Sequence, residues 1–230
     1  MMAAAALAIQ RIAIVDDNPH DADVMSEIVR DAGFEPVILK PPFGHVEDLL
    51  ANVQLQANAA ICDHRLRGQA HFTGAKAVAY FTEVKVPALL VTQYIDPDAD
   101  LSIRLWRHRI PVLLRRDEAD SDRITKGVEE CISELHGEYP RGRRPWRTMI
   151  QIDGTAEDNG ERVVEARVLS WNPHNVVRFP EELVPLELRD RLVPDAFMFA
   201  MVNIGAEKAD DLFFYDFEAA PEPASEDSLD

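Results

Sequence analysis

The sequence has 230 residues, which is enough for one large domain or two small ones. Its formal net charge of −17 at pH 7 argues against a nucleic-acid-binding protein, because phosphate backbones bind basic surfaces, and equally against binding to anionic membranes. Both cysteines, Cys62 and Cys131, fall in segments predicted to be buried. Reduced thiols, together with no signal-peptide pattern and no apolar stretch of membrane-spanning length, predict a cytoplasmic protein.

Residues 9–136 alternate between short apolar runs and helical patterns, which predicts a parallel sheet covered by helices on both faces. The first helical pattern opens at Pro19 or His20 and stops at Gly33. Its predicted apolar stripe consists of Val24, Met25, Ile28 and Val29. The predicted strands are residues 12–15, 36–39, 59–63, 88–92 and 110–114. Later helices are predicted to carry Val46, to span 75–84, to begin at Asp98 or Asp100, and to span 120–135.

The pattern changes after residue 136. Residues 137–147 (GEYPRGRRPWR) are rich in Pro, Gly and Arg and predict a linker. Residues 148–218 predict a small, mostly antiparallel β-domain, either a barrel or a sandwich, with one helical stretch at 181–192. Residues 219–230 predict an acidic disordered tail. The predicted strands are 149–152, 162–171, 176–179, 196–202 and 212–217, and the turn signals are Asp153-Gly154, Asn159-Gly160 and Asn172-Pro173.

Polar residues stand at the ends of four of the predicted parallel strands. Asp16 and Asp17 follow the first strand and Asp63 closes the third, so all three carboxylates are expected at one edge of the sheet. A divalent ion would relieve their mutual repulsion, and hard oxygen ligands suit Mg²⁺. A carboxylate beside such a metal can attack a phosphoryl group, while Thr92 and Arg115 at neighbouring strand ends offer a hydroxyl and a positive charge to its oxygens.

These residues, in this order and spacing, resemble the receiver domain of two-component response regulators. The resemblance runs from about Arg11 to Leu135, over half of the chain. It rests on the run from Val15 to Pro19 (VDDNP), on Asp63, on the hydroxyl of Thr92 and on a basic residue after the fifth strand.

The resemblance implies a doubly wound, flavodoxin-like sheet of strand order 2-1-3-4-5. It also implies that Asp63 accepts a phosphoryl group from a histidine kinase or another phosphodonor. Mg²⁺ would then be held by Asp16, Asp17, Asp63 and the backbone carbonyl of Arg65.

Four positions depart from the family pattern. Arginine, at Arg115 or Arg116, replaces the usual lysine, and it keeps the charge but is bulkier. Gln93 replaces a small residue after Thr92, Val112 replaces an aromatic residue, and Arg67 replaces a proline. These departures predict slow phosphorylation of Asp63.

Two alternatives remain open for the N-terminal domain. One is a pseudo-receiver, an interaction scaffold that has lost phosphotransfer. The other is a Mg²⁺-dependent phosphohydrolase, which is disfavoured because haloacid-dehalogenase-type phosphatases place their two aspartates two positions apart, whereas Asp16 and Asp17 are adjacent. The chain is therefore expected not to be an enzyme.

The β-domain shows no clustered catalytic or metal-ligand pattern and is expected to bind another protein, with a second copy of the chain as an alternative partner. In the run Phe213, Phe214 and Tyr215, neighbouring side chains of a strand point to opposite faces. At least one of these aromatic rings is therefore expected to be exposed or covered by another surface.

Overall fold

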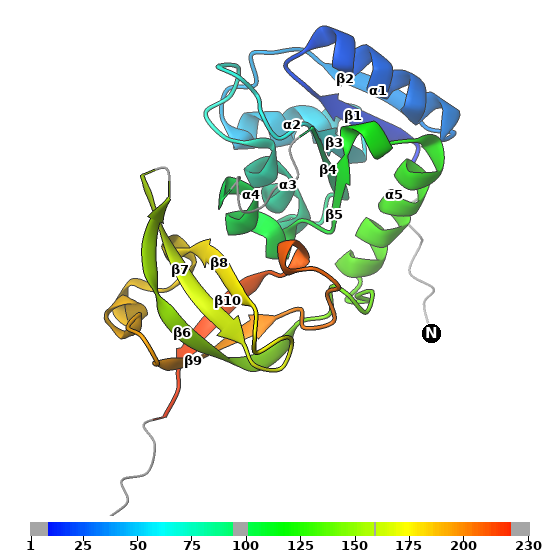
Figure 1. Ribbon diagram of the computed structural model, residues 1–230. Coiled ribbons are helices and arrows are strands. Elements are labelled where there is room, and N and C mark those ends of the chain that lie inside the picture. Colours follow the sequence, from blue (N-terminus) through cyan, green and yellow to red (C-terminus); the bar gives the residue numbers. More distant parts are fainter. Residues whose placement is uncertain (1–8, 94–100, 159, 222–230) are drawn as a thin grey trace, which may run out of the picture. The chain divides into compact units, whose positions relative to one another are not determined.

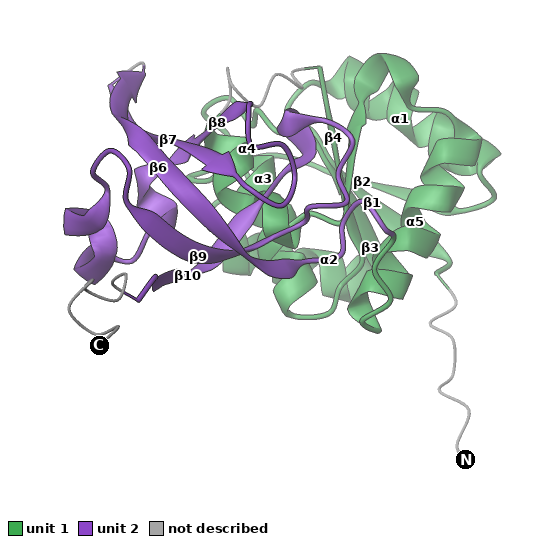
Figure 2. Ribbon diagram, turned by 60° about the horizontal axis from the view of Figure 1, so that its bottom comes forward, with its two compact units in different colours: residues 1–140 green, residues 141–230 purple. Residues whose placement is uncertain are grey.

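The computed structural model describes residues 9–93, 101–158 and 160–221 (Figure 1). The chain divides into two compact units, residues 1–140 and residues 141–230, which Figure 2 shows in different colours. None of the helices in the described part of the chain combines the length and the apolar character needed to cross a membrane.

The N-terminal unit is built on a parallel sheet whose strand order is β2-β1-β3-β4-β5, which confirms the predicted doubly wound topology. All four neighbouring pairs run parallel, with Val15 of β1 lying opposite both Leu39 and Cys62. The strands are β1 (Arg11–Val15), β2 (Glu35–Leu39), β3 (Ala59–Cys62), β4 (Ala88–Thr92) and β5 (Val112–Arg115).

The sheet is buried on both faces because successive side chains of each strand enter different cores. In β1, Ile12 and Ile14 pack on one side, while Ala13 and Val15 pack on the other. Helices α1 and α5 cover the first face, and α2, α3 and α4 cover the second. The helices are α1 (Pro19–Asp31), α2 (Val46–Gln56), α3 (Gly74–Glu83), α4 (Leu101–Trp106) and α5 (Ser121–Leu135).

Helix α1 begins where the sequence predicts. Asn18 caps it by accepting a hydrogen bond from the His20 N–H at 3.1 Å, and Pro19 occupies the first turn, where its missing N–H costs nothing. The predicted stripe is wrong at Val24, a residue that is 45% exposed. The buried residues, at helical spacing, are Ala22, Met25, Ser26 and Val29.

The fifth strand starts and ends later than predicted. It covers Val112–Arg115, so Arg115 is its last residue and Arg116 opens the short 3-10 helix η2 (Arg116–Glu118). Asp98 and Asp100, the predicted caps of the fourth helix, lie outside the described residues.

The C-terminal unit contains one antiparallel sheet of order β10-β9-β6-β7-β8. The sheet curls so far that its two edge strands share a core: the Phe179 ring of β8 stacks on Phe214 of β10 with 4.6 Å between ring centroids, and lies 5.5 Å from Phe217. The strands are β6 (Trp146–Asp158), β7 (Glu161–Val168), β8 (Val176–Pro180), β9 (Phe197–Val202) and β10 (Phe214–Ala219).

Two local predictions for this unit need correction. Asp153-Gly154 is not a turn but lies inside β6, where the pairing with β7 shifts register at Gly154. A glycine inside a strand is a common bulge site, so the Asp-Gly dipeptide is compatible with a turn and also with a bulge inside a strand. The predicted helix over 181–192 forms two 3-10 helices instead, η3 (Glu181–Leu183) and η4 (Leu186–Arg191).

The segments predicted as linker and tail are partly structured. The boundary between the two units falls within residues 137–147, and Arg143 is buried with its guanidinium 5.0 Å from the centre of the Phe213 ring. Ala219 is still part of β10, and residues 222–230 of the predicted tail lie outside the described residues.

Of the three aromatic rings, of which at least one was expected to be exposed or covered by another surface, Phe213 and Phe214 are buried and Tyr215 is half-buried. Phe213 precedes the strand and is 2% exposed, and Phe214 is 1% exposed in the core of the unit. A register shift after Tyr215, where Asp216 has a φ of 50°, turns Phe217 to the same inner face as Phe214. The alternation on which the prediction depended does not include Phe213, because that residue lies before the strand begins.

Candidate functional site

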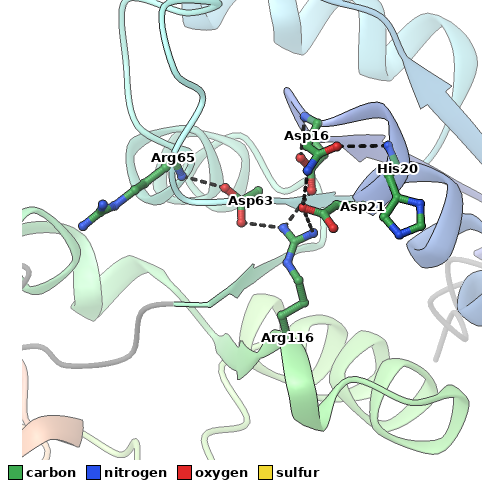
Figure 3. A network of polar contacts seen from close by, with 7 residues as sticks. Asp16, His20, Asp21, Asp63, Arg65 and Arg116 are labelled. Atoms are coloured by element: carbon green, nitrogen blue, oxygen red, sulfur yellow. Dashed lines mark hydrogen bonds and ion pairs between the residues drawn. The ribbon is translucent and has the colours of Figure 1, made fainter.

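The carboxylates of Asp16 and Asp63 lie side by side at the carboxyl edge of the parallel sheet (Figure 3). The Asp63 N–H donates to the Val15 carbonyl at 2.9 Å, which fixes the end of β3 beside the end of β1. Both side chains are largely buried, with exposed fractions of 6% for Asp16 and 12% for Asp63. They border a cavity of about 270 Å³ that is lined by Asp16, Asp17, Asn18, Asp21, Asp63, Arg65, Arg67, Gln93 and Arg116.

Local backbone hydrogen bonds orient these two carboxylates. Asp16 Oδ1 accepts from the Asn18 N–H at 2.9 Å, and Asp63 Oδ2 accepts from the Arg65 N–H at 2.8 Å. The start of α3 can approach the backbone of Asp63 closely because residue 74 is glycine, and a Cβ there would collide with the Asp63 carbonyl oxygen. Each carboxylate therefore has one oxygen held by its own loop and the other left to face the cavity.

The oxygens that face the cavity both bind Arg116. Its Nη2 lies 2.7 Å from Asp16 Oδ2 and 2.6 Å from Asp63 Oδ1, and its Nη1 lies 3.2 Å from Asp21 Oδ2. One guanidinium thus joins three carboxylates, which lie directly after β1, in α1 and directly after β3. Figure 3 shows the side chain reaching up to them from the segment after β5.

The structure brings Arg116, not Arg115, to the carboxylates. Arg115 ends β5 with its side chain 51% exposed, and its Nε pairs with Asp117 Oδ1 at 3.0 Å. The two arginines are adjacent in sequence, so the choice depends on where the strand ends. The predicted strand ends at residue 114, one residue before the observed end, and this error is enough to obscure the choice.

The other predicted site residues have different surroundings. Asp17 and Arg65 line the cavity, and the Arg65 N–H donates to Asp63 Oδ2. Thr92 ends β4 as predicted and is fully buried, and the cavity wall at this point comes from Gln93. Asp21 was missed: it stands in the first turn of α1, where an acidic residue is ordinarily explained by the helix dipole.

Burial shapes the protonation of the central ion pair. It is the main reason why the pKa of Asp16 is raised, with a smaller contribution from the Asp63 charge, against the hydrogen bonds from Asn18 and Arg116. Burial would also lower the pKa of Arg116, but its bonds to Asp16 and Asp63 outweigh that effect and raise it overall. Arg116 is therefore a permanent positive charge in the site.

The donor atoms of the site suit Mg²⁺, but their arrangement does not. Mg²⁺ requires oxygens about 2.0–2.1 Å away in near-octahedral geometry. Arg116 Nη2 already bridges Asp16 Oδ2 and Asp63 Oδ1, the oxygens that such an ion would share. Within residues 9–93, 101–158 and 160–221, no three His, Cys, Asp or Glu side chains form a group that could hold a metal ion.

Among known proteins, only solved structures are similar to this chain. No family model and no curated protein sequence matches the chain. Many similar structures are response-regulator receiver domains, which match about 55% of the chain in its N-terminal part, and the C-terminal unit is matched to no family.

Three of these structures come from different organisms. The CheY-like receiver domain protein from Methanospirillum hungatei JF-1 is 18% identical and covers 57% of this chain and 99% of its own, with a TM-score of 0.42. The response regulator TrrA from Thermotoga maritima, in complex with Mg(2+)-BeF, is 19% identical with coverages of 53% and 98% and a TM-score of 0.40. A DNA-binding response regulator of the LuxR family from Staphylococcus aureus is 12% identical with coverages of 54% and 98% and a TM-score of 0.42.

Proposed function

We propose that the chain is a response-regulator-like signalling protein whose N-terminal unit is a receiver-like module with Asp63 as its phosphoacceptor. One observation carries the proposal: Asp63 and Asp16 converge with Arg116 at the carboxyl edge of a sheet of order 2-1-3-4-5. This edge is where open α/β sheets bind ligands. The cavity there gives a phosphoryl group access to the Asp63 carboxylate.

The residues of the cavity suggest how phosphotransfer would proceed. Asp63 Oδ1 would attack the phosphorus of a phosphohistidine, forming an acyl-phosphate bond while the P–N bond breaks and the imidazole leaves with the electron pair and takes up a proton. Arg116, already 2.6 Å from that oxygen, would stabilise the charge on the transferred group. Arg65 and Arg67 are exposed on the cavity rim and would attract the anionic donor.

Intact-mass measurement after incubation with acetyl phosphate and Mg²⁺ tests this role. We expect addition of one phosphoryl group to the wild type and none to Asp63→Asn, which lacks the acceptor. Addition to the wild type should be slow, because Gln93 lines the cavity and Arg116 holds the acceptor oxygen. Asp23→Asn serves as a matched control, since it removes an exposed carboxylate of α1 outside the cavity and keeps both the acceptor and the cavity lining. Equal modification of wild type and Asp63→Asn would contradict the assignment.

A second candidate is favoured by the same contacts. Because Arg116 already neutralises Asp16 and Asp63, the cluster could serve only to hold the ends of β1, β3 and β5 together in a phosphorylation-independent scaffold. A complete lack of modification in the acetyl phosphate experiment, combined with a large loss of stability in Asp63→Asn, would favour this pseudo-receiver.

We also propose that the C-terminal unit binds a protein partner under the influence of the N-terminal unit. The sequence suggested Phe213 or Phe214 as the partner contact, but both rings are buried. Phe197 on β9 and Trp146 on β6 instead keep 44% and 47% of their surface exposed. Capture of one defined protein from native extract by the full chain, lost in Phe197→Ser, is the expected result. Binding to DNA by the wild type would contradict it.

A further inference from the structure

The position of Arg116 has a consequence for metal binding. A single nitrogen, Nη2, makes contacts of 2.7 and 2.6 Å with the two carboxylate oxygens that face each other across the site. A cation shared by these oxygens would have to sit at the same point. Arg116 and a divalent ion therefore cannot bind Asp16 Oδ2 and Asp63 Oδ1 at the same time.

Arg116 is also anchored outside this pair. Its Nη1 binds Asp21 Oδ2 at 3.2 Å, and the same oxygen accepts from Asn18 Nδ2 at 2.9 Å. The planar guanidinium fork makes these separate contacts possible, whereas the compact ammonium of a lysine is a point charge. The contacts hold the side chain in place, so its withdrawal requires breaking three ion pairs together.

We propose that Arg116 is a built-in counter-ion that competes with Mg²⁺ for the carboxylates, so that the metal binds only when this side chain withdraws. The proposal rests on the proposed function in one respect, that this edge of the sheet is the functional one. The four aspartates and three arginines that line the cavity leave a formal charge of −1, so the site still attracts a cation. The competition lowers the metal affinity of the site and does not abolish it.

The test measures Mg²⁺ affinity by titration calorimetry on the full chain, comparing the wild type with Arg116→Ala and Arg115→Ala. Arg115→Ala is the matched control because it removes an equal charge one residue away, from a side chain paired with Asp117. We expect Arg116→Ala to bind at least about tenfold more tightly than the wild type, and Arg115→Ala to match the wild type. Unchanged affinity in Arg116→Ala, or the same gain in Arg115→Ala, would overturn the proposal.

Thermal unfolding provides a second readout. Without metal, Arg116→Ala leaves two buried carboxylates without their counter-ion, and its Tm should fall by about 10 °C. Added MgCl₂ should restore most of this loss, while the Tm of the wild type should change little. The double variant Arg116→Ala/Asp63→Asn should lose both the gained affinity and the rescue.

If Arg116→Ala does not fold alone, recovery of its native circular dichroism on adding MgCl₂ supports the proposal. Arg116→Gln, which keeps a hydrogen-bonding side chain without the charge, is the second variant. Failure of MgCl₂ to recover Arg116→Ala, together with unchanged affinity in Arg116→Gln, would overturn it. Tighter Mg²⁺ binding without any phosphotransfer would refute only the phosphoacceptor role of Asp63, whereas phosphotransfer with unchanged affinity in both variants would refute only the counter-ion.

Discussion

In the N-terminal unit all strands run parallel, so their carboxyl ends lie along one edge of the sheet, whereas neighbouring strands of the C-terminal unit are antiparallel and their ends alternate between two edges. The parallel arrangement gathers Asp16, Asp63 and the segment bearing Arg116 into one buried cluster. The antiparallel unit instead distributes its ion pairs along the sheet, such as Arg167 with Asp153 and Arg178 with Asp158 and Glu165. Similar side chains thus form a more deeply buried candidate site in one unit and more exposed ion pairs in the other.

The buried polar groups of the C-terminal unit serve structural roles. Asn203 is fully buried and joins three segments: its Nδ2 donates to the carbonyls of Gly142 and Asp211, and its Oδ1 accepts from the Phe213 N–H at 2.7 Å. Its Oδ1 thus satisfies the buried N–H of Phe213, and its Nδ2 is in turn satisfied by two backbone carbonyls. Strand direction therefore decides where chemistry can concentrate in each unit.

The largest expected effect comes from breaking the core of the C-terminal unit alone. Phe214→Ser removes a buried ring that stacks on Phe179 and should cost about 4 kcal/mol or more. Hydrogen exchange followed by mass spectrometry should show loss of protection in residues 141–221 with little change in the parallel sheet. Phe197→Ser, at a half-exposed position of the same sheet, is the control and should cost much less. Equal losses in both units would show that their stabilities are coupled.

A smaller effect distinguishes the buried ion pair from a surface pair. A double-mutant cycle on Arg116 and Asp16, whose side chains are 17% and 6% exposed, should give a coupling energy of about 2–3 kcal/mol. The equivalent cycle on Arg167 and Asp153, which are 39% and 23% exposed, should give less than about 1 kcal/mol. Urea unfolding of the two sets of alanine variants measures both values. Comparable coupling energies would remove the energetic distinction between the two units.

The features that the sequence predicts well are those set by periodicity. Alternating burial in β1 follows from the period-2 geometry of a strand, and the meeting of Asp16 with Asp63 follows from parallel strands ending at one edge. Arg116 could not be distinguished from Arg115 because a side chain changes direction with each residue, so a small error in the strand boundary decides which arginine reaches the site. The bulges at Gly154 and Asp216 were missed for a related reason, since one extra residue inverts the alternation locally.

The smallest expected effect is a difference in how the two units respond to acid. The pKa of Asp16 is raised above 3.8, chiefly by burial, so the folded state binds this proton more tightly than the unfolded state. Ionised Asp16 therefore costs stability at neutral pH, and this cost disappears as pH falls through the folded-state pKa. Glu218 shows the opposite behaviour: the hydrogen bond from Arg147 lowers its pKa below 4.5, so its contribution is present above that value and is lost as pH falls further.

Hydrogen exchange between pH 7 and pH 4 can follow both units in one sample, once the intrinsic pH dependence of exchange is removed. The stability of the wild type relative to Asp16→Asn should rise in the N-terminal unit as pH falls toward 4, because only the wild type has the raised carboxyl pKa. The stability of the wild type relative to Glu218→Gln should stay level and then begin to fall in the C-terminal unit near the acid end. If both relative stabilities fell together as pH is lowered, the Arg116 contacts, and not burial, would dominate the titration of Asp16.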